Sequence, residues 1–298
     1  MQQMTDRQIY IAEAPGVARA LGQSDTMRGF EIREHDSVQF PEQDPMAWHV
    51  DGNRMPIENT NFMADKITEG KYESIIGGLS NAYAVNKIAD EVTEHIYGDG
   101  KENKGGGNVL VVTPHAEVTD IAFSLKIISD LLEARGKRPD LGILLSKMVP
   151  EYNYLTSDGP VSAIFVLQLL CSDIYMSWPR TDSSKSLLDK LPKSELKRHN
   201  NVLLQGILKR FQLGKMVLAM APTGTTQVNQ RDSGERELAK FSERTTSMML
   251  DPNTKVLVMV ANILRGAKLV VKLPSGLIAV RDMDDAENLR QYLGSLHV

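Results

Sequence analysis

Apolar runs alternate with segments of helical periodicity along the second two thirds of the chain. The run Val109–Thr113 is continuously apolar up to its last residue, which is typical of a buried strand. The segment that follows, Ile121–Arg135, has the spacing of a helix, and Gly136 is suited to end it. Its apolar positions recur every three or four residues: Ile121, Leu125, Ile128 and Leu132. The pattern therefore predicts a strand followed by a helix.

The same alternation continues to the C-terminus. Further strands are predicted at Leu141–Leu145, Asp173–Trp178, Met216–Met220, Val256–Val260 and Leu269–Leu273. Helices are predicted at Ser162–Leu170, Ser183–Asn200, Val202–Phe211 and Asp284–Leu293, and from a capping box of Asp232 and Glu235 to about Leu250. Strands that alternate with helices predict an α/β fold, with a mostly parallel central sheet flanked by helices.

The N-terminal third has a different texture. Residues 1 to about 60 are interrupted by prolines and acidic residues, which predicts short helices and extended loops. Residues 61–98 are more helical, and five glycines between Gly98 and Gly107 indicate a linker or exposed loop. We therefore expect two parts, a loop-rich and helical appendage at residues 1–100 and an α/β domain at residues 105–298.

Composition excludes several classes of protein. The formal charge of −4 without a basic cluster argues against a nucleic-acid partner. The single cysteine, Cys171, excludes an internal disulfide framework and lies in an apolar stretch typical of a buried residue. The N-terminus lacks the features of a signal peptide, and no apolar stretch is long enough to cross a membrane. We expect a cytoplasmic protein, for which reversible contact with a membrane surface stays open.

The first candidate catalytic residues, His115 and Asp120, come just after the first predicted strand. Thr113-Pro114 disfavours helix before His115, so the histidine is expected in a loop and Asp120 in the first turn of the next helix. An aspartate bonded to one imidazole nitrogen leaves the other nitrogen as a base for a hydroxyl proton. The plainer alternative is a loop histidine beside a helix cap formed by Thr119 or Asp120.

Two other candidates also follow apolar strands. Arg180 comes after the strand at residues 173–178 and could bind phosphate through two parallel hydrogen bonds, or simply pair with Asp182. The turn Thr223-Gly224-Thr225-Thr226 follows the strand at residues 216–220, and its N–H groups and hydroxyls could hold a phosphate or an oxyanion. Its alternative is an ordinary turn. Because sites in parallel sheets gather at the carboxyl ends of strands, we expect these residues at one edge.

Taken together, these blocks resemble the glycerolipid acyltransferase family, over roughly residues 105–265. His115 and Asp120 match its His-x-x-x-x-Asp motif, and Arg180 loosely matches its second motif, an apolar strand that ends in arginine. Ala221-Pro222-Thr223-Gly224-Thr225-Thr226 stands where the family has Phe-Pro-Glu-Gly-Thr-Arg. Lys147 corresponds to a lysine that the family carries after its second strand.

The sequence departs from this family at several points. Thr223 and Thr226 replace the glutamate and arginine of the third motif, and the strand at residues 256–260 lacks the proline of the fourth. Arg231 and Arg236 could supply the missing charge, although solvated residues are the simpler interpretation. These departures fit either an altered acceptor or a retired enzyme.

The resemblance implies acyl transfer from acyl-CoA or an acyl-carrier protein to a hydroxyl of a glycerol-phosphate or lysophospholipid-like acceptor. It implies that His115 takes the hydroxyl proton and that Asp120 orients His115. It also implies that Gly224 and Thr225 donate hydrogen bonds, and that Arg180 with Lys147 holds an anionic head group. No cofactor or metal is expected. The alternatives are a non-catalytic lipid- or partner-binding protein on the same fold and a hydrolase of acyl esters.

Overall fold

A computed structural model describes the chain in part. The described residues are 9–12, 32–35, 47–49, 64, 70–99, 105–113, 118–146, 153–156, 159–162, 173–177, 193–222, 228–230, 236–238, 240–264, 268–272 and 276–296. The strands are β1 (Ile9–Ala12), β2 (Ile32–His35), β3 (Ala47–His49), β4 (Asn108–Val112), β5 (Asp140–Ser146), β6 (Asn153–Thr156), β7 (Gly159–Ser162), β8 (Asp173–Ser177), β9 (Met216–Met220), β10 (Val228–Gln230), β11 (Arg236–Leu238), β12 (Thr254–Val258), β13 (Val260–Leu264) and β14 (Lys268–Lys272). The helices are α3 (Tyr72–Ser80), α4 (Tyr83–Tyr97), α5 (Val118–Glu133), α8 (Lys193–Gln212), α9 (Glu243–Met249) and α10 (Met283–Ser295).

A six-stranded sheet forms the centre of the fold, in the order β12-β4-β9-β5-β8-β3. The first five strands of this order are all parallel, and β3 adds to β8 in the antiparallel direction. The other strands pair two by two outside this sheet, as β1-β2, β6-β7, β10-β11 and β13-β14. The expected α/β fold with a mostly parallel central sheet is therefore confirmed.

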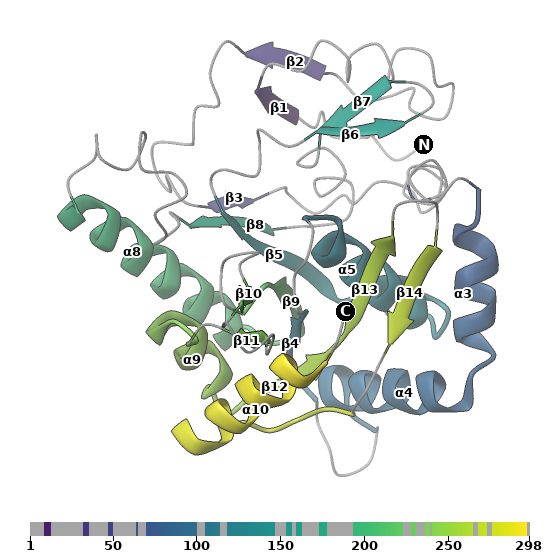
Figure 1. The fold of residues 1–298 in the computed structure, drawn as a ribbon. Coiled ribbons are helices and arrows are strands. Elements are labelled where there is room, and N and C mark those ends of the chain that lie inside the picture. The colour runs from purple at the N-terminus through teal and green to yellow at the C-terminus, as the bar shows by residue number, and fades with distance from the viewer. Residues whose placement is uncertain are drawn as a thin grey trace, which may run out of the picture.

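Helices cover both faces of the sheet (Figure 1). Alternate residues of each strand face opposite sides, so Val109 and Val111 of β4 join the core formed with α4 and α5. Leu110 and Val112 join a second core, formed with α8, α9 and α10. Every residue of β4 and β9 is buried, which explains why these segments read as continuous apolar runs.

The connections run in opposite directions on the two faces. From β4 the chain passes through α5 to β5, which lies beyond β9 in the sheet. From β8 it returns through α8 to β9, and then through α9 to β12. Since α5 covers one face and α8 and α9 cover the other, the crossovers after the neighbouring strands β4 and β9 leave to opposite sides. Such a doubly wound sheet has a topological switch point between those two strands.

The expected N-terminal helices are α3 and α4, and they pack on the α5 face. Val92 and Ile96 of α4 are fully buried in the same core as β4 and α5. The glycine-rich segment after α4 is held to it, since the N–H of Gly106 donates to the carbonyl of Ile96 at 2.8 Å. A Cβ on Gly107 would lie 2.3 Å from the ring of His95, so only glycine fits this contact. The domain boundary near residue 100 stays a prediction.

Several expected elements differ from the structure. Residues 193–212 form one helix, α8, without the expected break near Asn200. The capping box of Asp232 and Glu235 is wrong, because residues 236–238 form β11 and the helix begins after Ser242. The strand expected at residues 256–260 ends at Val258, and β13 begins at Val260. Most of the helix expected at residues 162–170 lies outside the described residues, and residue 162 ends β7.

Candidate functional site

The candidate site lies at one edge of the sheet, where β4, β9, β5 and β8 end. Val112 of β4 pairs with Met220 of β9, and Met220 also pairs with Leu144 of β5. Ser146 at the end of β5 pairs with Ser177 at the end of β8. The four strands are parallel and aligned in register, so the segments that follow them all leave from the same edge.

Each candidate residue follows one of these strand ends by a short stretch of chain. His115 comes three residues after β4, Lys147 one residue after β5, and Arg180 three residues after β8. Thr223 comes three residues after β9, and the turn continues as Gly224, Thr225 and Thr226. All of these residues lie outside the described residues. Three residues reach at most about 10 Å, while neighbouring strands are about 4.8 Å apart.

Asp120 is the third residue of α5, so the expectation that it falls in the first helical turn is confirmed for its backbone. Its side chain is outside the described part of the chain. The segment between β4 and α5 carries His115, and the segment after β9 carries the threonine turn. The strands that precede these two segments, β4 and β9, lie on either side of the switch point, which is the position where parallel sheets commonly bind ligands.

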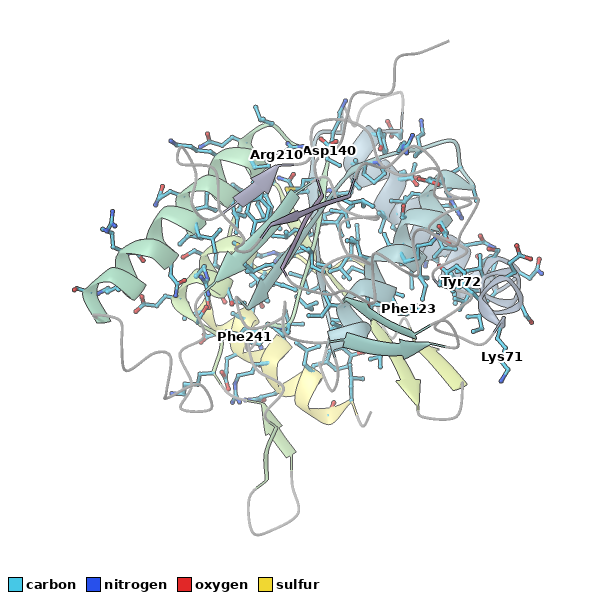
Figure 2. All side chains as sticks on the ribbon, turned by 90° about the horizontal axis from the view of Figure 1, so that it is seen from above. Lys71, Tyr72, Phe123, Asp140, Arg210 and Phe241 are labelled. Carbon is cyan, nitrogen blue, oxygen red and sulfur yellow. The ribbon has the colours of Figure 1, made fainter. Side chains whose placement is uncertain are left out.

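Contacts with α3 fix the position of α5. The hydroxyl of Tyr72 donates to the carboxylate of Asp130 at 2.7 Å, and Lys126 forms an ion pair with the same carboxylate. The ring of Phe123 meets the edge of the Tyr72 ring at 6.0 Å between centroids (Figure 2). Lys126 also lies over the Tyr72 ring, at 5.1 Å from its centroid. These buried contacts stabilise the position of α5, the helix that contains Asp120.

On the opposite face, α9 packs against the end of β9. Ser242 caps α9, because its hydroxyl oxygen accepts a hydrogen bond from the N–H of Thr245 at 3.1 Å. The hydroxyl of Thr245 in turn donates to the carbonyl of Pro222 at 3.2 Å. The last described residue before the threonine turn is therefore tied to a capped helix.

One residue at this edge was missed by the sequence analysis as a candidate. Thr113 follows β4 directly and is 0% exposed. Its N–H donates to the carbonyl of Met220 at 3.3 Å, but its side-chain hydroxyl has no hydrogen-bond partner among the described residues. A threonine at the end of an apolar run carries no signal of this by itself. Burial of an unpaired hydroxyl is visible only in three dimensions.

The described residues contain neither a metal-binding cluster nor a membrane-spanning helix. They contain no group of three or more histidine, cysteine, aspartate or glutamate side chains that could hold a metal ion. None of the helices over these ranges is long and apolar enough to cross a membrane.

Comparison with known proteins adds no relative. No model of a known protein family matches the chain, and no curated protein matches it either. The resemblance to glycerolipid acyltransferases therefore depends on the motifs at residues 115–120, 174–180 and 221–226 and on the strands that precede them.

Proposed function

We propose that this protein transfers an acyl group from a thioester donor, acyl-CoA or an acyl-carrier protein, to a hydroxyl of a glycerol-phosphate or lysophospholipid-like acceptor. The observation that carries the proposal is the alignment of β4, β9, β5 and β8. All four blocks that resemble the acyltransferase family follow parallel strands that end at one edge of one sheet. The two blocks with the chemistry of transfer, at residues 115–120 and 223–226, follow β4 and β9 in the chain, and these strands lie on either side of the switch point.

The reaction requires a base and a place for negative charge. In the proposed mechanism, His115 takes the proton of the acceptor hydroxyl while the hydroxyl oxygen forms a bond to the thioester carbonyl carbon. The carbon–sulfur bond breaks as the tetrahedral intermediate collapses, and the departing thiolate takes the proton from the imidazolium. Asp120 orients His115 and stabilises its charged form. Gly224 and Thr225 donate hydrogen bonds to the oxyanion or the acceptor.

The acceptor is the less defined substrate. Arg180 and Lys147 offer positive charge for a phosphate, whereas Thr223 and Thr226 offer only hydroxyl and backbone groups. We therefore propose that the acceptor has an anionic head group, which Arg180 binds. We also propose that the protein acts in the cytoplasm or at a membrane surface that it contacts reversibly.

The central test measures thiol release from an acyl thioester, with and without an alcohol acceptor. Wild type should release thiol in an acceptor-dependent manner, and His115→Ala should lower the rate by about 10²–10⁴, the usual contribution of a general base. The matched control is His95→Gln, because His95 contacts Asn108 at the opposite, amino-terminal end of β4. Far-UV circular dichroism shows whether each variant is folded.

Three outcomes would contradict the proposal in different ways. Acceptor-independent thiol release would indicate a hydrolase, in which water replaces the alcohol. Binding of acyl-CoA without turnover on any phosphorylated or neutral acceptor would indicate a binding protein. Turnover by His115→Ala at the wild-type rate would exclude His115 from the mechanism.

A second experiment tests the anionic acceptor. Arg180→Ala should raise the KM for glycerol-3-phosphate far more than it lowers kcat, because a contact to the head group persists from ground state to transition state. Arg198→Ala is the control, since Arg198 is exposed on α8. A preference for an uncharged lysolipid or polyol, together with no effect of Arg180→Ala, would refute the phosphate part of the proposal and leave acyl transfer intact.

A further inference from the structure

We propose that the exposed face of α8 is a docking surface for an acidic protein that carries the acyl group, so that the donor is an acyl-carrier protein. This inference rests on the proposed function and specifies its donor. It starts from charge, because α8 is basic and the rest of the chain is acidic. The helix contains five basic residues and one acidic residue, whereas the remainder of the chain contains 29 basic and 37 acidic residues.

Four side chains of α8 form an exposed line, which we call the α8 surface: Lys197, Asn201, Gln205 and Lys209. They follow each other at intervals of four residues, so they lie on the same side of the helix. The line is about 18 Å long, since a helix rises about 1.5 Å per residue. Arg210 is ion-paired with Asp140 (Figure 2), whereas the two lysines form no ion pair with a described residue.

The shape and polarity of the α8 surface fit a protein partner. Sites for small molecules are usually concave and mostly apolar, but this surface is the outer side of a helix and is entirely polar. Among the described side chains of α8, no large apolar one is exposed, and the nearest, Leu213, follows the last residue of the helix. The α8 surface therefore has no apolar group to insert among lipids, which favours a protein held by charge.

The charge of the whole molecule directs an acidic partner to α8. The formal charge is +4 on α8 and −8 on the remainder, with histidine counted as neutral. An acidic protein is repelled by the net charge of the remainder and attracted by α8, so it meets the chain preferentially on this helix. Acyl-carrier proteins are small acidic proteins, whereas acyl-CoA is a small molecule that a convex helix surface cannot enclose. The charge distribution therefore complements the protein donor.

The helix also leads from the α8 surface to the edge of the sheet that carries the candidate site. It returns from β8, which ends at that edge, to β9, which begins at the opposite edge (Figure 1). The last turn is fixed near the start of β4, because the side chain of Asn108 donates to the carbonyl of Phe211. A helix of this length spans about 30 Å and a five-residue strand about 17 Å, so the first turns, with Lys197, extend toward the candidate site.

The experiment measures binding of an acyl-carrier protein that bears phosphopantetheine and no acyl group, by isothermal titration calorimetry. The double variant Lys197→Glu/Lys209→Glu should raise the Kd about tenfold, because each reversal removes an attraction and adds a repulsion. The matched control is Lys71→Glu/Lys87→Glu, at exposed lysines just before α3 and on α4, which pack on the other face of the sheet. This control should bind like wild type.

Two further measurements support the comparison. The variant Lys197→Gln/Lys209→Gln removes the charges without adding repulsion and should raise the Kd about threefold, which keeps the test usable if circular dichroism shows that charge reversal disturbs the fold. In turnover, donor selectivity is the kcat/KM for the acyl-carrier-protein thioester divided by that for the CoA thioester of the same chain. This ratio should fall about tenfold in the double charge reversal.

Several outcomes would overturn the inference. One is a Kd of Lys197→Glu/Lys209→Glu equal to that of wild type, and another is an equal rise in Kd for the control variant. Binding of wild type to phosphatidylglycerol-containing vesicles, without binding to the acyl-carrier protein, would identify the α8 surface as a membrane contact instead.

Failure of this inference can be told from failure of the proposed function. Turnover of acyl-CoA by a wild-type protein that does not bind the acyl-carrier protein would overturn the docking surface alone. Binding that depends on Lys197 and Lys209, without turnover of either thioester, would contradict acyl transfer and support the docking surface.

Discussion

Asn108 offers the sharpest test of how this sheet is held together. It is fully buried at the start of β4, and its side chain makes two hydrogen bonds to distant segments. Its amide nitrogen donates to the carbonyl of Phe211 at 2.9 Å, and its amide oxygen accepts from the N–H of Met216 at 3.2 Å. One side chain thus joins β4 to the end of α8 and the start of β9.

Substitution of Asn108 by Leu keeps the volume and removes both bonds. The carbonyl of Phe211 still accepts from the N–H of Gly214 at 2.9 Å, so it keeps a partner. The N–H of Met216 loses its acceptor, which costs about 1–3 kcal/mol for a buried group, and the second lost bond adds about 1 kcal/mol. We expect a loss of about 3 kcal/mol, which corresponds to a fall in Tm of about 6 °C for a chain of this size.

The assay is urea unfolding followed by far-UV circular dichroism. The midpoint should fall with an unchanged slope, because the surface exposed on unfolding stays the same. Asn81→Leu is the control, since Asn81 is exposed after α3. A midpoint for Asn108→Leu within error of wild type would show that these two hydrogen bonds contribute no net stability, and the reasoning would be refuted.

Three further predictions concern single side chains. Burial lowers the pKa of His95, so the unfolded chain binds the proton more readily than the folded protein, and the free energy of unfolding falls as the pH drops below about 6.5. The difference between the unfolding free energies at pH 7.5 and pH 5.5, measured with urea, should be smaller for His95→Gln than for wild type. An equal difference in the two proteins would contradict this prediction. Tyr72→Phe should cost about 1.5 kcal/mol, because it removes the bond to Asp130, and an unaltered urea midpoint would count against that bond. Gly214→Ala should lower the Tm more than Gly136→Ala. Both glycines have a positive φ, but of the two only Gly214 would bring a Cβ against a backbone oxygen, at 2.3 Å. An equal fall in Tm for the two variants would show that this clash has no effect on stability.

The elements that the sequence predicted well are those with strong local signals. The strands β4, β5 and β9 consist mostly of apolar residues, because both faces of the sheet are covered. Gly136 ends α5 as expected: it has a φ of +66°, and the N–H of Lys137 bonds back to the carbonyl of Leu132. These features depend on residues close together in the chain.

The errors have identifiable physical causes. Asp232 and Glu235 have the spacing of a capping box, but residues 236–238 pair with β10 as an antiparallel hairpin, and Ser242 supplies the cap instead. The break expected near Asn200 is absent because neither glycine nor proline interrupts the helix from residue 193 to 205. The addition of β3 to β8 could not be predicted, since it joins segments more than a hundred residues apart.

The candidate site, too, was predicted from the sequence only in part. Sequence order and spacing predicted which residues follow strands, and the backbone confirms the strands before them. Strand order decides which of these residues are neighbours, and that order depends on contacts between distant segments. The burial of the Thr113 hydroxyl could not be predicted at all, because it depends on what surrounds that group in the folded protein.

The position of β9 sets the order in which this protein can be completed during synthesis. It is the strand between β4 and β5, yet it begins at Met216, about seventy residues after β5 ends at Ser146. A nascent chain that has already produced β4, α5 and β5 lacks the strand that lies between those two in the folded sheet, because β9 has not yet left the ribosome. Both strands present unpaired edges to the cell until it arrives, and such edges invite pairing with other chains. The native pairing of β4 and β5 with the strand between them can therefore form only after residue 220 has been synthesised.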